Sequence, residues 1–174
     1  MSEDYKEAFE KTRVAGSIAA GALDEVAKII KPGIKTNKID EVCYNFIKDH
    51  GAYSAPLFYR GFPKSCCTST NHIVCHGIPS DKILKEGDIV NVDVTAFKDG
   101  WHGDTSRTFE IGKISVKAKK LVKTTHDAMM NAIKIVKENI YLGDIGATIQ
   151  SYVEAEGFSV VQDFCGHGIG QKFH

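Results

Sequence analysis

A predicted β-hairpin from Asp88 to Glu110 constrains the fold of this chain more than any other stretch. Alternate residues of its outgoing strand are apolar, namely Val90, Val92, Val94 and Ala96. The residues between them must therefore share the opposite face. Lys98-Asp99-Gly100 supplies the turn, since an Asp-Gly step is typical of tight hairpins. The sequence thus predicts an antiparallel sheet with one apolar face and one polar face.

The polar face of this hairpin carries two aspartates, Asp93 and Asp104. Whether the central pair of the turn is 98–99 or 99–100, both side chains fall on the same face. Their Cβ atoms would be about 5 Å apart if directly opposite and about 7 to 8 Å apart if diagonal, so the carboxylates repel each other. The face is either simply solvated or forms an oxygen-rich site for a divalent metal ion, which two converging carboxylates favour. The expected hydrogen-bond partners of these carboxylates are four flanking polar residues, Asn91, Thr95, His102 and Ser106.

Composition points to a single soluble domain, because 25% of the 174 residues are charged and 43% are hydrophobic. The net charge is zero, which disfavours a nucleic-acid or membrane-surface role. We interpret a local run of lysines as one solvated helix face; it comprises Lys113, Lys117, Lys119, Lys120 and Lys123. The start shows no signal-peptide pattern, and no apolar run approaches about 18 residues. The five cysteines form no CxxC pair, so we expect reduced thiols in a cytoplasmic protein.

Amphipathic helices are predicted on both sides of the hairpin. Two precede it, one from the possible N-cap Ser2 to Lys31 and one from near Thr36 to Gly51. Two follow it, one from the N-cap Ser115 to about Glu138 and one from about Asp144 to Glu156. Placing Lys28, Ile29 and Gly51 over Lys134, Ile135 and Gly157 aligns the two helix pairs, although amphipathic helices can also match by chance. We predict a duplication, with residues 1–113 as the first half-repeat and 114–174 as the start of the second.

Three further clusters could carry chemistry. His76 lies among turn formers in Cys75-His76-Gly77-Ile78-Pro79. It either faces a cleft at a strand end, or its imidazole is simply hydrogen-bonded to the backbone. The glycines of Gly166-His167-Gly168-Ile169-Gly170 allow close backbone approach and would expose the imidazole to a ligand. The third cluster is Phe173-His174. A nucleotide-binding α/β protein has little support, because the glycine spacing is not that of a dinucleotide site and no phosphate-binding Lys-Ser or Lys-Thr follows.

Four segments together resemble the signature segments of type I methionine aminopeptidases, in order over nearly the whole chain. They are Cys75-His76-Gly77-Ile78-Pro79, Asn91-Val92-Asp93-Val94, Gly103-Asp104-Thr105-Ser106-Arg107-Thr108-Phe109 and Gly166-His167-Gly168-Ile169-Gly170. The resemblance implies the α+β pita-bread fold, whose two halves are related by a pseudo-twofold axis, in agreement with the predicted repeat. It also implies a metalloexopeptidase that removes the initiator methionine by means of a metal-activated water.

Carried over by position, the resemblance assigns metal ligation to Asp93, Asp104 and His167, with Asp104 bridging two divalent ions (Mn, Fe, Co or Zn). His76 and His174 would be catalytic, orienting the scissile peptide and steadying its developing charge, and His76 would also bind substrate. The methionine side chain would lie against aromatic and sulfur-containing neighbours, which a thioether favours; these are Tyr59, Phe62, Cys67 and Phe173. Pro56 stands where bacterial members often have a cysteine, which would alter the pocket rim.

One departure from the family pattern concerns two further glutamate ligands, one of which doubles as general base. Glu154 and Glu156 do not fit these roles, because they precede the His167 segment on a predicted helix. We therefore expect residues 1–174 to be a single catalytic domain that is truncated at the C-terminus, with an incomplete second half, and inactive by itself. The alternative is a natural truncation that serves as a non-catalytic pita-bread module and binds peptides or a partner.

The resemblance also implies the partners. Substrates would be nascent polypeptide N-termini, with the ribosome surface as a candidate partner. No nucleic-acid-specific or membrane partner is expected, and the complete enzyme would be a monomer.

Overall fold

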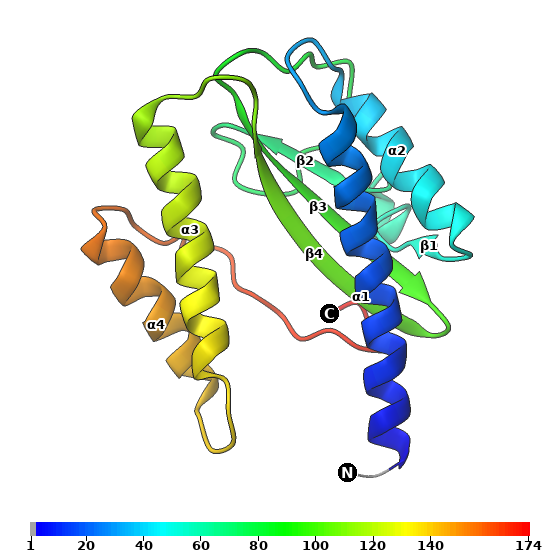
Figure 1. Ribbon diagram of the computed structural model, residues 1–174. Coiled ribbons are helices and arrows are strands. Elements are labelled where there is room, and N and C mark those ends of the chain that lie inside the picture. The colour runs from blue at the N-terminus through cyan, green and yellow to red at the C-terminus, as the bar shows by residue number, and fades with distance from the viewer. Residues whose placement is uncertain (1–2) are drawn as a thin grey trace. The chain divides into compact units, whose positions relative to one another are not determined.

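The computed structural model describes residues 3–174, so the predicted N-cap Ser2 lies outside the described part of the chain. The chain divides into two compact units. The first runs to Ile114 and includes the segment His167–His174, and the second is Ser115–Gly166. Figure 1 labels the helices and strands of both units.

The first unit combines two long helices with a four-stranded antiparallel sheet. Its elements in chain order are α1 (Glu3–Ile29), α2 (Thr36–Asp49), β1 (Tyr53–Ser54), the 3-10 helix η1 (Tyr59–Gly61), β2 (Cys67–Thr70), β3 (Ile89–Lys98) and β4 (Trp101–Glu110). Both helices predicted here are confirmed, with slightly shorter C-terminal ends. Gly33, with φ at 91°, follows α1 in a left-handed conformation that glycine adopts at little cost.

Strand β3 is the centre of the sheet. It pairs with β4 along its whole length, from Ile89 opposite Glu110 to Lys98 opposite Trp101. The short strands β1 and β2 pair with different parts of its other edge. The central hairpin is therefore the scaffold on which every other strand of the sheet is placed.

The hairpin turn has Asp99 and Gly100 as its central pair, with φ at 50° and 86°. Positive φ at both positions is the type I′ geometry that suits tight hairpins. In this register Asp104 lies directly opposite Thr95, while Asp93 lies opposite Ser106. Asp93 and Asp104 are thus diagonal neighbours on one face of the sheet, as the alternation predicts.

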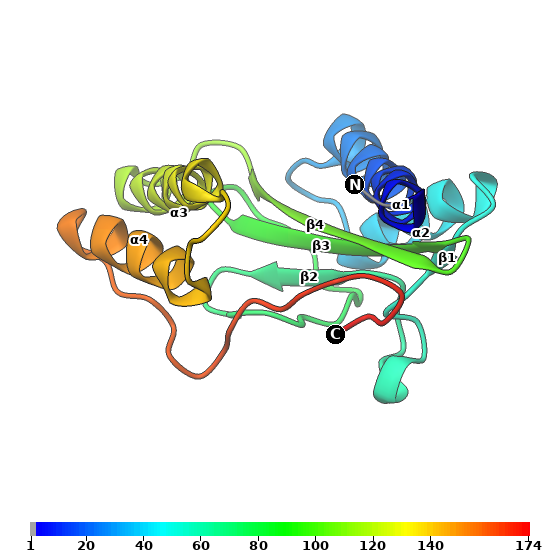
Figure 2. The same ribbon diagram turned by 90° about the horizontal axis from the view of Figure 1, so that it is seen from below.

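The apolar face of β3 lies at the centre of the hydrophobic core. Its fully buried members are the predicted Val90, Val92, Val94 and Ala96. Figure 2 shows α1 and α2 covering this face of the sheet. Helix α1 rests directly on β4, because a Cβ atom on Gly103 would lie only 2.1 Å from the backbone nitrogen of Gly16. The opposite, polar face remains available for a site.

The second unit contains two helices, α3 (Val116–Ile135) and α4 (Leu142–Ala155), which pack side by side. The predicted N-cap of α3 is confirmed, since Ser115 Oγ accepts a hydrogen bond from the Ala118 backbone N–H at 3.1 Å. The lysines of α3 are exposed, as predicted for a solvated face, and Lys123 pairs with Asp127 one turn away. No helix within residues 3–174 is long and apolar enough to span a bilayer.

Candidate active site

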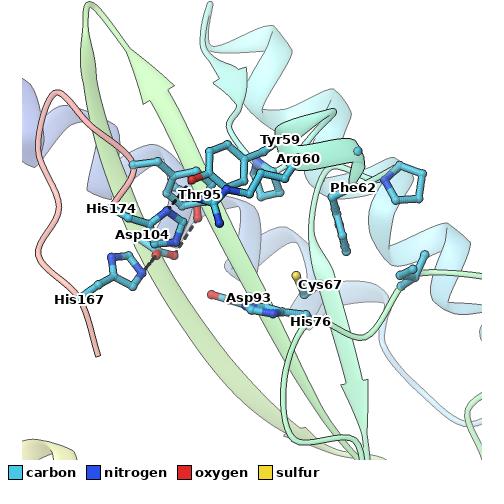
Figure 3. A pocket seen from close by; sticks show the side chains of 15 residues that line it. Tyr59, Arg60, Phe62, Cys67, His76, Asp93, Thr95, Asp104, His167 and His174 are labelled. Atoms are coloured by element: carbon cyan, nitrogen blue, oxygen red, sulfur yellow. Dashed lines mark hydrogen bonds and ion pairs between the residues drawn. The ribbon is translucent and has the colours of Figure 1, made fainter. Parts of the chain in front are cut away.

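One cavity of about 410 Å³ in the first unit gathers the residues that the sequence singled out (Figure 3). Each residue to which the resemblance assigned a role lines this cavity: Tyr59, Phe62, Cys67, His76, Asp93, Asp104, His167, Phe173 and His174. They come from η1, the η1–β2 loop, β2, the β2–β3 loop, both hairpin strands and the segment His167–His174. Residues that are far apart in the sequence therefore share a single chemical environment.

The two aspartates meet on the polar face of the hairpin. Burial raises the pKa of Asp93 from its ordinary value to about 7, and the neighbouring charge of Asp104 and a side-chain hydrogen bond with it act in the same direction. Thr95 Oγ1 donates a hydrogen bond to Asp104 Oδ1 at 2.9 Å and so orients that carboxylate. Asp93 therefore keeps its proton to a higher pH than an exposed aspartate does.

His167, from the segment His167–His174, lies next to these carboxylates. Its Nε2 lies 3.6 Å from Asp104 Oδ2, and its Nδ1 lies 3.0 Å from the Gly168 carbonyl oxygen. Because a carbonyl only accepts, Nδ1 carries the hydrogen, and Nε2 is the ring nitrogen that faces the carboxylate. An imidazole nitrogen and a carboxylate oxygen at this distance are close enough to share a proton or a cation.

The chemistry of this donor set fits a divalent metal ion. Carboxylate oxygen and imidazole nitrogen are ligands that Mn, Fe, Co and Zn all accept. Within residues 3–174, however, no group of three or more His, Cys, Asp or Glu side chains already has the spacing that encloses a metal ion. Among the described residues, Asp93, Asp104 and His167 therefore do not form a closed coordination shell.

His76 is placed by its backbone. Its φ of 55° is uncommon for a non-glycine residue. The next residue must be glycine, since a Cβ on Gly77 would lie 2.3 Å from the Thr68 carbonyl oxygen. Gly77 also bonds β2 twice, accepting from the Thr68 N–H at 2.7 Å and donating to Ser69 Oγ at 3.1 Å. This attachment holds the imidazole-bearing loop at the cavity.

Aromatic rings and a thiol form the apolar part of the cavity. The Tyr59 and Phe173 rings meet edge to face with centroids 4.9 Å apart, and the Tyr59 hydroxyl is 3.1 Å from His174 Nδ1. Burial raises the pKa of Cys67 to about 12, with a further contribution from the charge of Asp93. The thiol is therefore neutral and behaves as a small apolar group.

Some expected contacts differ from those observed. Thr95 bonds a carboxylate as expected, but Asn91 donates to Ser106 and Thr108, at 3.3 and 3.1 Å. The His102 ring bonds the Gly170 carbonyl oxygen instead of a carboxylate. Asn91 therefore connects β3 to β4, and His102 connects β4 to the segment His167–His174.

Arg60 is a cavity residue that the sequence analysis missed. Its guanidinium lies 5.5 Å from the centre of the Tyr59 ring. After burial and the charge of His167, the charge of Arg60 also lowers the pKa of His174. Its position between Tyr59 and Phe62 was the available signal, although side-chain direction there depends on a left-handed backbone, with φ at 48°.

Comparison with known proteins identifies the family. The model of metallopeptidase family M24 matches residues 10–174, so the chain belongs to this family of metal-dependent peptidases. Within it the chain is similar to the methionine aminopeptidase of Rickettsia prowazekii, with 55% identity over 166 residues, and to that of Escherichia coli K12, with 51% over 170 residues. These alignments cover 95% and 97% of this chain and 64% of each relative. The chain thus spans slightly less than two thirds of these relatives' length.

Solved structures support the same assignment. The methionine aminopeptidases of R. prowazekii and Thermotoga maritima each superpose with a TM-score of 0.95, at 54% and 38% identity, covering 97% of this chain and 68% of theirs. A prolidase from Pyrococcus furiosus, at 21% identity and a TM-score of 0.81, shares the fold over 97% of this chain and 49% of its own. The predicted α+β pita-bread fold is therefore confirmed, and the resemblance to methionine aminopeptidases is borne out.

Proposed function

We propose that this chain forms the metal-binding and methionine-binding part of an enzyme that removes the N-terminal initiator methionine from nascent proteins and peptides. The observation that carries the proposal is the joining of two features in one cavity. Donors suited to a divalent cation, from Asp93, Asp104 and His167, lie beside an apolar wall of aromatic rings and a neutral thiol. Similarity to relatives named methionine aminopeptidase, at 55% and 51% identity, supports the same substrate.

In this proposal Asp93, Asp104 and His167 would hold the metal, and Asp104 would be shared between two ions. Thr95 orients Asp104 through Oδ1, and Oδ2 faces His167, so these two proposed ligands lie together. When bound, divalent cations such as Mn, Fe, Co or Zn polarise a substrate carbonyl and activate water. Asp93 must lose its proton before it binds a cation, so proton release and metal binding are coupled.

The remaining cavity residues would recognise and orient the substrate. A methionine thioether gains from the ring faces and the sulfur neighbour that Tyr59, Phe62, Cys67 and Phe173 offer. His76 and His174 line the same cavity and would orient the scissile peptide and steady its developing charge. Because the Tyr59 hydroxyl engages His174 Nδ1, the other ring nitrogen is left for the substrate.

Partners and organisation complete the proposal. Nascent N-termini are the expected substrates, and the ribosome surface is a candidate partner of a monomeric enzyme in the cytoplasm. The free state of all five cysteines supports a reducing compartment. Residues 1–113 and 114–174 are proposed as related half-repeats, since the helix pair α1–α2 has a counterpart in α3–α4.

A peptide-binding module without catalysis is the second candidate, and the open coordination shell favours it. The deciding experiment measures methionine release from Met-Ala-Ser by the whole protein with Mn²⁺, using Leu-Ala-Ser as control substrate and Asp104→Asn as control variant. We expect release from Met-Ala-Ser alone, with loss of activity in Asp104→Asn. Equal rates on the two peptides would contradict the methionine pocket. Tight binding without release, unchanged in Asp104→Asn, would support the module.

A further inference from the structure

The segment His167–His174 brings two histidines and a phenylalanine to the cavity without forming a helix or strand. Figure 2 shows it running on the face of the sheet opposite α1 and α2, and in Figure 3 it carries His167 and His174 toward Asp104 and Tyr59. His167 and His174 can hold fixed positions only if some contact fixes the backbone between them.

His102 makes that contact. It lies in β4, close to the hairpin turn. Its backbone N–H donates to the Gly170 carbonyl oxygen at 2.9 Å, and its ring Nδ1 lies 3.0 Å from the same oxygen. A carbonyl oxygen has two lone pairs and can only accept, so the Nδ1 of His102 must carry the hydrogen. One residue therefore satisfies both lone pairs of Gly170.

The His102 ring also packs between aromatic side chains. Its centroid lies 4.6 Å from that of Phe97 and 5.4 Å from that of Phe173, and the ring planes of His102 and Phe173 are inclined by only 10°. Gly170, which His102 binds, falls between His167 and His174 in the chain. An anchor at this point restrains both histidines at once.

We propose that His102 is a positioning residue of the active site: its Nδ1–H holds the Gly170 carbonyl and so docks the segment that presents His167 to Asp104 and His174 to Tyr59. Its functional meaning rests on the function proposed above, whereas the docking itself does not. His102 touches no reacting atom in this role. It acts by limiting where two other imidazoles can lie, which matters because small misplacements of such groups are costly.

The test separates the donor from the ring. His102→Asn keeps an N–H donor near the position of Nδ1 but removes the ring, whereas His102→Phe keeps the ring and removes the donor. His50 supplies a matched control, because its Nδ1 lies 2.8 Å from the Phe46 carbonyl oxygen and its ring packs on Phe46 outside the cavity. The same two substitutions at His50 change an equivalent contact that holds no functional segment.

Two measurements report docking without metal or substrate. The first is hydrogen exchange of the residue-102 amide, which donates to the Gly170 carbonyl oxygen. The second is the fluorescence emission of Trp101, the single tryptophan of the chain. Gly170 lies against its ring, since a Cβ on Gly170 would be 3.6 Å away, so undocking changes the surroundings of the ring. We expect His102→Phe to speed that exchange by roughly two- to tenfold and to shift the emission, and His102→Asn to stay near the parent protein. Both His50 variants should leave these signals unchanged.

Metal binding supplies the functional readout. Co²⁺ affinity, measured by calorimetry, should fall about tenfold in His102→Phe and stay near the parent value in His102→Asn, because an undocked His167 cannot ligate.

Should His102→Phe fail to fold, the imidazole ¹⁵N spectrum of the parent protein remains decisive, with hydrogen on Nδ1 expected. Hydrogen on Nε2, docking retained in His102→Phe, or docking lost equally in both His102 variants would overturn the proposal. Normal docking effects in a whole protein that releases no methionine would instead reject the proposed function alone.

Discussion

His167 Nε2 lies 3.6 Å from Asp104 Oδ2, which brings an irregular segment near one end of the chain to the middle of strand β4. Asp104 is held from its other side by Thr95, directly opposite on β3. Its two oxygens therefore have different neighbours, one a hydroxyl donor and one an imidazole. Asp104 is therefore a second contact, beside His102, between the hairpin and the segment His167–His174.

The first prediction concerns metal stoichiometry. The proposed ligands Asp93, Asp104 and His167 cannot saturate two centres, so the 174-residue chain should bind at most one Mn²⁺ or Co²⁺ ion tightly. Asp104→Asn should abolish this binding, because it removes a charged ligand, and the exposed Asp24→Asn should not change it. Calorimetric titration measures both. Two tight sites in this chain would reveal ligands that are not identified here.

The second prediction concerns the pH dependence of stability without metal. The pKa of Asp93 is raised to about 7 in the folded chain, chiefly by burial, from an ordinary value of 3.8. The folded state therefore binds the proton more tightly than the unfolded state, and the stability from this group is fully present below about pH 4. It should be lost as pH rises through about 7, by an amount on the order of a few kcal/mol. Urea unfolding in the presence of a chelator, repeated between about pH 4 and pH 7, measures how the free energy of unfolding changes with pH.

The matched variant for this pH effect is Asp93→Asn, which is close in shape but does not titrate. It should remove most of the slope between pH 4 and 7. A slope unchanged in Asp93→Asn would mean that another group carries the titration.

The third prediction concerns the contact of α1 with β4. Gly103→Ala should destabilise the fold by several kcal/mol, on the order of 3 or more, because its Cβ would lie 2.1 Å from the Gly16 backbone and neither element can yield cheaply. Gly16→Ala is the reciprocal control, since a Cβ there meets nothing within 4 Å. In a helix it should be neutral or stabilise by about 0.5 to 1 kcal/mol. Thermal unfolding compares the two, and equal effects would argue against this close approach.

The fourth prediction concerns the loop that bears His76. Ser69→Ala removes the acceptor of the Gly77 N–H and should cost about 1 kcal/mol of stability, with a further loss of kcat in the whole protein as His76 becomes less ordered. Thr70→Val is the control on the same strand, because the Thr70 hydroxyl is buried and has no hydrogen-bond partner among residues 3–174. It should be neutral or slightly stabilising. Urea midpoints and kinetics on Met-Ala-Ser check both, and a larger effect of Thr70→Val would refute this account.

Much of the fold could be predicted from the sequence, because its signals are local. The alternation Val90, Val92, Val94 and the Asp99-Gly100 turn define the hairpin within a few residues of backbone, whichever way the rest of the chain folds. The same alternation places Asp93 and Asp104 on one face before any tertiary contact forms. Ser115 caps α3 through a bond to a residue of the next turn, which is equally local.

The tertiary structure alone decided how the remaining site residues meet. No periodicity predicts that Tyr59 reaches His174, that Gly77 locks the backbone of His76, or that His102 turns from the carboxylates to Gly170. These contacts join segments with no fixed spacing in the sequence. Each depends on which surfaces pack together, because a hydrogen bond between distant residues forms only after burial has brought both partners within about 3 Å.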